Sequence, residues 1–354
     1  MDYILSPCTL TAEGLSRMMA QDHQHQTRLQ PQERIPSSVS VRRMAVFLPD
    51  RPLWLLSTLR HAAFLLKQAD SPLPMLILSH CPAGWLWHTL LHLVADRALL
   101  NRVRAASSSL PVRYLAALLH SHEPENYPPL EQLSGLETVI HGRSPGGLSK
   151  PELNVILDLL DGYSIIDQVK HRGISQKTLY HRRTSGLKKM AEHYPYLAAG
   201  FPGYPVSRQS SEGRDVLSVF EHEFVHAIHC RHISPVFQPL TGTRQQLQGV
   251  SIIFRWHRDG NILLPGEFLP HVNSEYALLV LSAFMLRETV QYIRQYPGEF
   301  CFSLNIPPAI AGHRNLLRMI KTTRQQLHQF NQSDRLVLEF TETIGLSRGG
   351  CDDD

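Results

Sequence analysis

The chain has 354 residues, a formal net charge of +4 and 43% hydrophobic residues. Its length predicts two or three domains, and the hydrophobic content is sufficient for ordinary cores. The small positive charge, with an isoelectric point near 8.8, is by itself weak evidence for a nucleic-acid partner.

The cysteines and the amino terminus both bear on the cellular compartment. The five cysteines are scattered without a CxxC pair, which is typical of free thiols in a reducing compartment. The first residues lack the basic segment and apolar run of a secretory signal. Charged residues interrupt even the most apolar region, 54–78. We therefore expect a cytoplasmic protein that does not contact a membrane.

In residues 1–143, short apolar runs alternate with longer helical stretches. The expected strands are 3–5, 43–48 and 73–78, and the expected helices are 10–19, 53–67 and 85–101. This alternation predicts an α/β domain with a parallel sheet covered by helices. A segment rich in Pro and Gly at 120–147 marks the end of this domain.

A compact helical block follows at 144–196, and capping residues mark its helix boundaries. Ser149 and Glu152 form an S-x-x-E capping box ahead of an apolar helical face. The boundaries of the second and third helices are set by Gly162, Ser164, Gly173 and Ser175. Short helices joined by a tight glycine-containing turn are typical of a helix-turn-helix, whose later helix enters the DNA major groove.

The charge of this block has the sign that DNA requires. Residues 148–190 include eight Lys or Arg and four Asp or Glu, so the segment carries a charge of +4. Most of the basic residues lie in its second half, where they can neutralise phosphates while polar side chains reach base edges. An ordinary three-helix bundle with a solvated basic face explains the composition equally well, so the choice depends on specific motifs.

Three motifs occur here in order, LSKPE at 148–152, GYS at 162–164 and ISQKTLYH at 174–181. They resemble the LuxR-type DNA-binding domain, which implies a three- or four-helix domain that binds double-stranded DNA. Gly186 stands where that family has an apolar residue, and Gly within a helix costs about 1 kcal/mol relative to Ala. The candidate DNA-binding residues are Lys170, Ser175, Gln176, Lys177, Thr178, Tyr180, His181, Arg182, Arg183 and Lys188.

An α/β domain ahead of such a module resembles the receiver domain of response regulators. Receivers need acidic residues after the first strand to hold Mg²⁺, and an Asp after the third to accept phosphate. Here Ser6 and Cys8 follow the first strand, and Asp50 is the only candidate phosphoacceptor. We favour the alternative that Asp50 caps the helix that starts near Pro52. The sequence therefore predicts a receiver-like domain without phosphotransfer.

Beyond an expected linker at 197–214, strands and helices alternate again over 215–354. Five ordered motifs lie in this region: FQPL at 237–240, FRW at 254–256, LPGEFLP at 264–270, SLN at 303–305 and LEFTE at 338–342. They resemble the front half of an EAL domain, a TIM-barrel phosphodiesterase for cyclic di-GMP. The resemblance implies a partial, truncated (β/α) barrel, and we hypothesise that its unrelated tail, 347–354, arises from a frameshift or early stop.

The resemblance to the EAL family also implies a vestigial site. The positions that match metal ligands are Asn305, Glu339 and Glu342, and those that match dinucleotide contacts are Gln238 and Arg255. The signature Glu is replaced by Ser251, and a hydroxyl is a poorer ligand for a hard cation than a carboxylate. We therefore expect no hydrolysis, and Mg²⁺ or Mn²⁺ as cofactors only if the site is active.

The sequence also contains a formal H-E-x-x-H motif at 222–226, which can bind Zn²⁺ when both histidines share one face of a helix. His229 replaces the glycine of the longer metalloprotease pattern that ends at His232, and His does not readily adopt the turn that glycine supplies. We favour an amphipathic helix ahead of the first barrel strand.

Taken together, these features predict a DNA-binding transcriptional regulator with no catalytic residues, no metal and no cofactor. The flanking domains are expected to mediate homodimerisation or contact with a protein partner, with weak binding of cyclic di-GMP. One alternative is a cyclic di-GMP phosphodiesterase with an altered active site. Another is a decaying gene product in which only the DNA-binding part functions.

Overall fold

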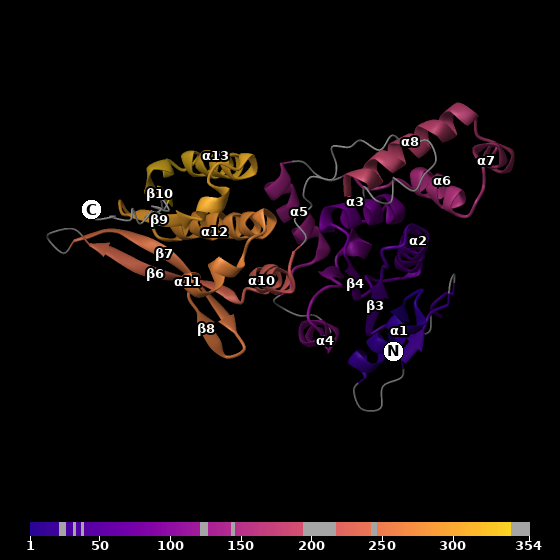
Figure 1. Ribbon diagram of the computed structural model, residues 1–354, viewed down its shortest axis with the longest axis horizontal. Coiled ribbons are helices and arrows are strands. Elements are labelled where there is room, and N and C mark those ends of the chain that lie inside the picture. Colours follow the sequence, from indigo (N-terminus) through magenta and orange to yellow (C-terminus); the bar gives the residue numbers. More distant parts are fainter. Residues whose placement is uncertain are drawn as a thin grey trace, which may run out of the picture. The chain divides into compact units, whose positions relative to one another are not determined.

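The computed structural model describes residues 1–20, 26–30, 33–36, 39–120, 127–142, 146–193, 217–241 and 246–340. The chain divides into two compact units, Met1–Glu223 and Phe224–Asp354. Each contains a sheet with helices packed on it (Figure 1). The predicted linker at 197–214 and the candidate ligand Glu342 lie outside the described residues.

The first unit is built on a parallel five-stranded sheet with the strand order β2-β1-β3-β4-β5. The strands are β1 (Asp2–Leu5), β2 (Gln26–Arg28), β3 (Arg43–Phe47), β4 (Met75–Ser79) and β5 (Val103–Ser107). The helices are α1 (Thr9–Met19), α2 (Pro52–Gln68), α3 (Ala83–Val94), α4 (Val112–His120) and α5 (Leu130–His141). The predicted α/β architecture is confirmed for this region.

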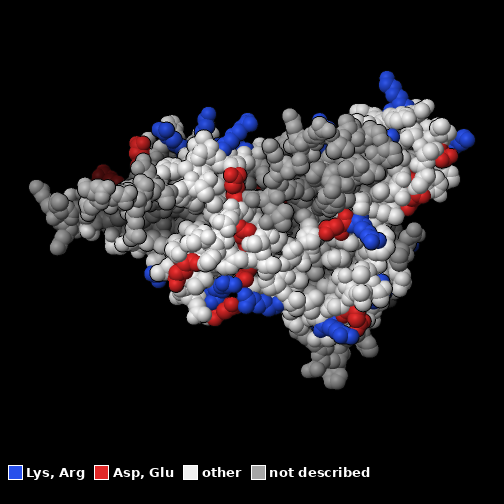
Figure 2. Space-filling view, viewed as in Figure 1, with Lys and Arg blue, Asp and Glu red and all other residues white. Residues whose placement is uncertain are grey.

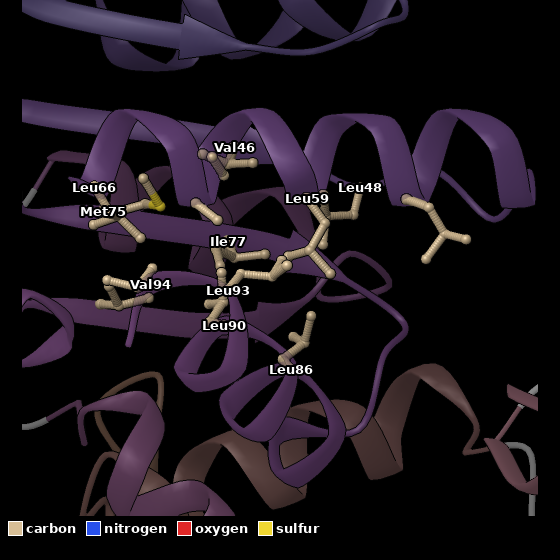
Figure 3. Close-up of a cluster of buried hydrophobic side chains, with 14 of the residues drawn as sticks. Val46, Leu48, Leu59, Leu66, Met75, Ile77, Leu86, Leu90, Leu93 and Val94 are labelled. Atoms are coloured by element: carbon tan, nitrogen blue, oxygen red, sulfur yellow. The ribbon is translucent and has the colours of Figure 1, made fainter. Parts of the chain in front are cut away.

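The core of this unit lies between the central strands and two of the helices. Figure 3 shows Val46 of β3 and Ile77 of β4 facing Leu59 of α2 and Leu90 of α3. All four side chains are buried. Strands buried in this way consist of continuous apolar runs, and such runs are what made β3 and β4 predictable from the sequence.

Two predictions for this unit were wrong in detail. The helix expected at 85–101 ends at Val94, because Ala95 adopts a left-handed conformation with φ of 66°. Asp50 does not cap α2: the N-cap residue is Arg51, and no side chain caps this helix. A buried acid caps α3 instead, since Glu137 of α5 accepts the N–H groups of Ala83 and Gly84 at 2.8 and 2.7 Å.

The helices of the helical block in the first unit begin where the sequence predicts. Its helices are α6 (Lys150–Leu160), α7 (Ile165–Arg172) and α8 (Gln176–His193). Ser149 and Glu152 form a capping box on α6, and Ser164 with Asp167 forms another on α7. Gly173 ends α7 with φ of 63°, a conformation that glycine adopts without strain.

This block packs on the α/β part of the first unit. Leu153 and Ile156 of α6 and Leu187 of α8 belong to the same buried cluster as the residues around α2 and α3. The N–H of Leu148 donates to the Thr89 hydroxyl on α3 at 3.0 Å. Gly147 lies so close to α3 that a Cβ atom would stand 2.2 Å from the Thr89 nitrogen. The approach therefore requires glycine.

The second unit contains a sheet with the order β10-β9-β7-β6, in which β8 also pairs with β7. The strands are β6 (Ile233–Thr241), β7 (Leu247–Arg258), β8 (Asn261–Leu263), β9 (Cys301–Ile306) and β10 (Leu336–Phe340). Strands β6 and β7 are antiparallel, whereas β7, β9 and β10 are parallel. The division between the units falls within α10 (Val219–His229), and the further helices of the second unit are α11 (Pro265–Phe268), α12 (Glu275–Gln295) and α13 (Arg314–His328).

Aromatic side chains fix one face of this sheet against its helices. Phe254 of β7 contacts Phe284 of α12 edge-on, with ring centroids 5.6 Å apart, and Trp256 contacts Phe224 of α10 at 5.5 Å. Successive side chains of a strand point to opposite faces. The alternate residues of β7, which include Ser251 and Arg255, therefore lie on the other face. Among the described helices, none is long and apolar enough to cross a membrane.

Candidate functional site

Helix α8 presents a polar stripe to solvent along its first three turns. Lys177, Tyr180, His181, Thr184 and Lys188 are all exposed, at helical spacings of three and four. Tyr180 is 45% exposed although its ring is aromatic. The stripe extends over the twelve residues 177–188, about 16 Å at 1.5 Å per step, which is enough to lie along a DNA groove.

The opposite side of α8 is buried, so the helix has one free face. Leu179, Leu187 and Met190 are each no more than 2% exposed. Arg182 and Arg183 lie between the two sides with intermediate exposure, and Gln176 is exposed in the first turn. Lys170 is exposed on α7. The structure thus gathers the predicted DNA-binding residues onto the beginning of α8 and the adjoining part of α7.

Two of the predicted DNA-binding residues also organise the start of α8. The Ser175 hydroxyl accepts the N–H of Thr178 at 3.2 Å, and the two hydroxyl groups lie 2.8 Å apart. An N-cap hydroxyl satisfies a helix N–H that has no partner within the helix. Ser175 therefore caps α8, as its predicted place at the start of the third helix implies.

A buried glutamate joins α6 to α8 beneath the exposed stripe. The carboxylate of Glu152 accepts from the Ser185 hydroxyl at 2.6 Å and from the Lys189 ammonium at 2.9 Å, in addition to its capping bonds with Ser149. Burial alone would raise the pKa of Glu152, but these hydrogen bonds outweigh it and lower the pKa to about 2. The carboxylate is therefore charged at neutral pH.

Gly186 lies at the point where α8 crosses α6. A Cβ atom there would stand 2.6 Å from Cδ1 of Ile156 and 3.3 Å from Cβ of Glu152. In an isolated helix Gly186 would only lower the stability of the helix. In the folded block its missing side chain allows the close approach that brings Ser185 and Lys189 to Glu152.

The described residues of one face carry both signs of charge. On the face shown in Figure 2, basic and acidic side chains are intermingled. Because the net charge of the chain is only +4, non-specific attraction is by itself a weak basis for nucleic-acid binding. Affinity for DNA would have to come from local contacts made by α7 and α8.

Strand register places the EAL-like residues of the second unit on one face of its sheet. Gln238 pairs with Ser251, and Ser251 pairs with Ser303. Asn305, two residues further along β9, pairs with Glu339. Directly paired residues point to the same face, so this polar face is the one opposite the aromatic contacts described above. Arg255 shares it, four residues beyond Ser251.

The carboxylate of Glu339 accepts a hydrogen bond from a neighbouring residue of the polar face. The Ser303 hydroxyl donates a hydrogen bond to Oε1 of Glu339. This role of Ser303 was not predicted, and its only signal in the sequence is its position two residues before Asn305. Gln238, Asn305 and Glu339 are exposed, whereas Ser251 is buried. With a hydroxyl at Ser251, the expected site residues described on this face supply one carboxylate, Glu339, and two amides, Gln238 and Asn305.

His226 of the H-E-x-x-H motif and His229, which lies three residues after it, have unlike surroundings. His226 is buried, with its Nε2 3.4 Å from the Cys230 sulfur. Burial, together with the nearby His226 and Arg287, lowers the pKa of His229 to about 3. Within the described ranges, no group of three or more His, Cys, Asp or Glu is arranged to hold a metal ion.

Comparison with known proteins identifies the second unit. Residues 221–349 match the EAL domain family. The cyclic di-GMP phosphodiesterase PdeL of Escherichia coli strain K12 is 22% identical over 235 residues, in an alignment that covers 58% of this chain and 61% of PdeL. The chain thus spans less than two thirds of that relative. Its C-terminal part contains an EAL domain related to cyclic di-GMP phosphodiesterases.

Solved structures show a weaker likeness. Vibrio cholerae LapD S helix-GGDEF-EAL bound to c-di-GMP is 13% identical with a TM-score of 0.32, and the match covers 36% of this chain and 32% of LapD. Full-length FixJ from B. japonicum is 16% identical with a TM-score of 0.22, covering 53% of this chain and 88% of FixJ. The Salmonella typhimurium response regulator RcsB is 14% identical with a TM-score of 0.21, covering 56% and 96%. These scores do not establish a shared fold.

Proposed function

We propose that this chain is a DNA-binding transcriptional regulator that reads double-stranded DNA with a LuxR-type helix-turn-helix formed by α6, α7 and α8. The observation that carries the proposal is the exposed polar stripe at the beginning of α8. A stripe with Lys177 and Lys188 near its ends offers phosphate contacts, and Tyr180, His181 and Thr184 between them offer groups for base edges.

The packing of the block supports this proposal. Capping boxes define both helices that precede α8, and the α6–α8 crossing is tied by Glu152 and permitted by Gly186. A reading helix must be held firmly to give sequence specificity. The α/β part of the first unit, which we take to be receiver-like, supports α6 from the other side through the shared core.

We further propose that the EAL domain does not hydrolyse cyclic di-GMP but binds it weakly or contacts a protein partner, and that the chain acts in the cytoplasm as a homodimer or with that partner. Ser251 replaces the signature glutamate, which reduces the negative charge available to a divalent cation. If Mg²⁺ or Mn²⁺ does bind, Asn305 and Glu339 are the described residues suited to hold it.

Salt dependence tests the DNA-binding proposal. Binding of the full chain to a fluorescein-labelled, mixed-sequence duplex is measured by anisotropy at several salt concentrations. Lys177→Ala and Arg182→Ala are each expected to weaken binding and to reduce the slope of log affinity against log salt by about one unit, because each loses one phosphate contact. Lys321→Ala removes an exposed cation on α13 and should leave the slope unchanged. Equal slopes in all variants would contradict the assignment.

The second candidate function is hydrolysis of cyclic di-GMP, which the EAL match and the relationship to PdeL favour. The test is turnover of cyclic di-GMP by the full chain with Mg²⁺ or Mn²⁺. We expect none above the background set by Glu339→Ala. Measurable turnover that this substitution abolishes would reverse the ranking of the two functions.

A further inference from the structure

Three loops at one edge of the first sheet bring together an acid, an imidazole and two hydroxyl groups. Asp50 follows β3, His80 follows β4, and Ser108 and Ser109 follow β5. These three strands are parallel neighbours, so their carboxyl ends open onto the same edge. In α/β sheets this is the edge where ligands bind.

The four groups form a hydrogen-bonded chain. His80 Nδ1 lies 3.0 and 3.1 Å from the two oxygens of Asp50. On the other side of the ring, Nε2 lies 2.7 Å from Oγ of Ser109 and 3.0 Å from Oγ of Ser108. An ionised carboxylate can only accept, so Nδ1 carries the proton and Nε2 presents a lone pair to the serines. Asp50 thus fixes the tautomer in which His80 can act as a base.

The backbone on both sides of this cluster is held by bonds that leave its side chains free to react. The Ser79 carbonyl accepts the N–H of Ser108 at 3.3 Å, which ties the end of β4 to the end of β5. The Ser107 hydroxyl accepts the N–H of Ser109 at 3.2 Å, and the Ser79 hydroxyl accepts the N–H of Cys81 at 2.9 Å. The loops that carry the base and the hydroxyl are therefore fixed relative to each other.

We propose that Ser109 is a nucleophilic serine, activated by His80 and oriented by Asp50, that accepts acyl or phosphonyl groups from small activated esters. His80 and Asp50 are 42% and 54% exposed, so such reagents can reach the cluster directly from solvent. Ser109, rather than Ser108, is the nucleophile because its hydroxyl lies nearer to Nε2. This activity is separate from DNA binding and from the EAL domain.

The steps balance without any further reactant besides water. Ser109 Oγ forms a bond to the ester carbon while its proton passes to Nε2 of His80. The ester C–O bond breaks, and the protonated imidazole returns the proton to the departing alkoxide, which leaves as the alcohol. Water, deprotonated by the same nitrogen, then attacks the acyl group and releases the acid and the free serine.

Labelling of the full chain with a fluorophosphonate probe tests the proposal. Attack by Ser109 forms an Oγ–P bond and expels fluoride, and peptide mass spectrometry locates the adduct. We expect one adduct, on Ser109, that forms about 100-fold faster than in His80→Ala, since general-base assistance contributes about 10²–10⁴-fold. Asp50→Asn should slow labelling, and Ser109→Ala should give no adduct.

The controls separate a base from a residue that only supports the fold. His92→Ala removes an exposed imidazole from α3 and should label at the wild-type rate. His80→Gln keeps hydrogen-bonding groups but has no basic nitrogen, so it should lose labelling while its thermal unfolding midpoint stays at the wild-type value. The proposal is overturned if the wild-type chain is not labelled, if the adduct lies on another residue, or if His80→Gln labels as fast as wild type.

Discussion

The helical block of the first unit has the residues that its helix starts and helix crossing need, whereas the polar face of the EAL domain lacks a carboxylate that a metal site would need. In the block, each helix start has its cap, and the crossing of α6 and α8 has both its glycine and the ion pair of Lys189 with Glu152. On the EAL face, strand register aligns the expected positions, but Ser251 stands at the position that the resemblance assigns to the signature glutamate. An aligned backbone is therefore insufficient for metal chemistry, which depends on the charge of each ligand.

The largest effect expected from this comparison is the loss of Glu152. Glu152→Ala removes the cap of α6 and leaves the Lys189 ammonium without its carboxylate at the α6–α8 crossing. Lys189 is 29% exposed and can turn to water, so the loss comes mainly from the capping and charge-assisted hydrogen bonds of Glu152, together about 2–3 kcal/mol. The free energy of unfolding, measured in urea, should fall by that amount. A loss no larger than that of Glu13→Ala, which breaks only the exposed pair of Glu13 with Arg17, would show that the crossing does not depend on Glu152.

Acidification should weaken the block through the same residue. Because the folded-state pKa of about 2 lies below the ordinary 4.5, the stabilisation by Glu152 is complete above about pH 4.5 and is lost as the pH falls to about 2. After allowance for solvent screening, about 2 kcal/mol is at stake. Urea unfolding across this range should show a smaller pH dependence in Glu152→Gln. An identical pH dependence in both chains would contradict the assigned pKa.

Overpacking at Gly186 should have an intermediate effect. Gly186→Val places side-chain atoms against Ile156, and overpacking of this kind costs about 1–3 kcal/mol. The matched variant Gly135→Val lies on α5, where a Cβ atom would meet nothing within 4 Å, and it should change the free energy of unfolding much less. If Gly186→Val were more stable than the wild type, the gain in helix propensity would exceed the cost of overpacking at the α6–α8 crossing.

The smallest effect is expected on the EAL face. Ser251→Glu returns a carboxylate to the position paired with Gln238 and Ser303, and should tighten Mn²⁺ binding by at least about tenfold, the scale on which changes around metal ligands act. Isothermal titration calorimetry measures it, with Ser251→Gln as the uncharged control. Equal affinity of both variants for Mn²⁺ would indicate that no other side chain of this face binds the ion together with the new carboxylate.

The sequence predicts features whose residues lie close together in the chain, and it misses features that depend on residues far apart. The capping boxes at Ser149 and Ser164 are short motifs, so both helix starts were correct. Strand β5 and helix α4 were missed because the sequence VRAAS of β5 has neither a long apolar run nor strict alternation. The bond from Ser303 to Glu339, across 36 residues, and the cluster around His80 depend on neighbouring strands, which a linear motif does not reveal.

The acid that caps α3 has a consequence for the joint between the sheet and the helical block. Burial raises the pKa of Glu137 to about 7, although the N–H groups of Gly84 and Ala83 act in the opposite direction. Between about pH 4.5 and pH 7 the folded chain therefore holds a proton that the unfolded chain has released, and alkalinisation disfavours the folded state. Helix α5, the last helix before the helical block, is thus fastened to α3 by a contact whose contribution to the stability of the fold falls as the pH rises from about 4.5 to about 7.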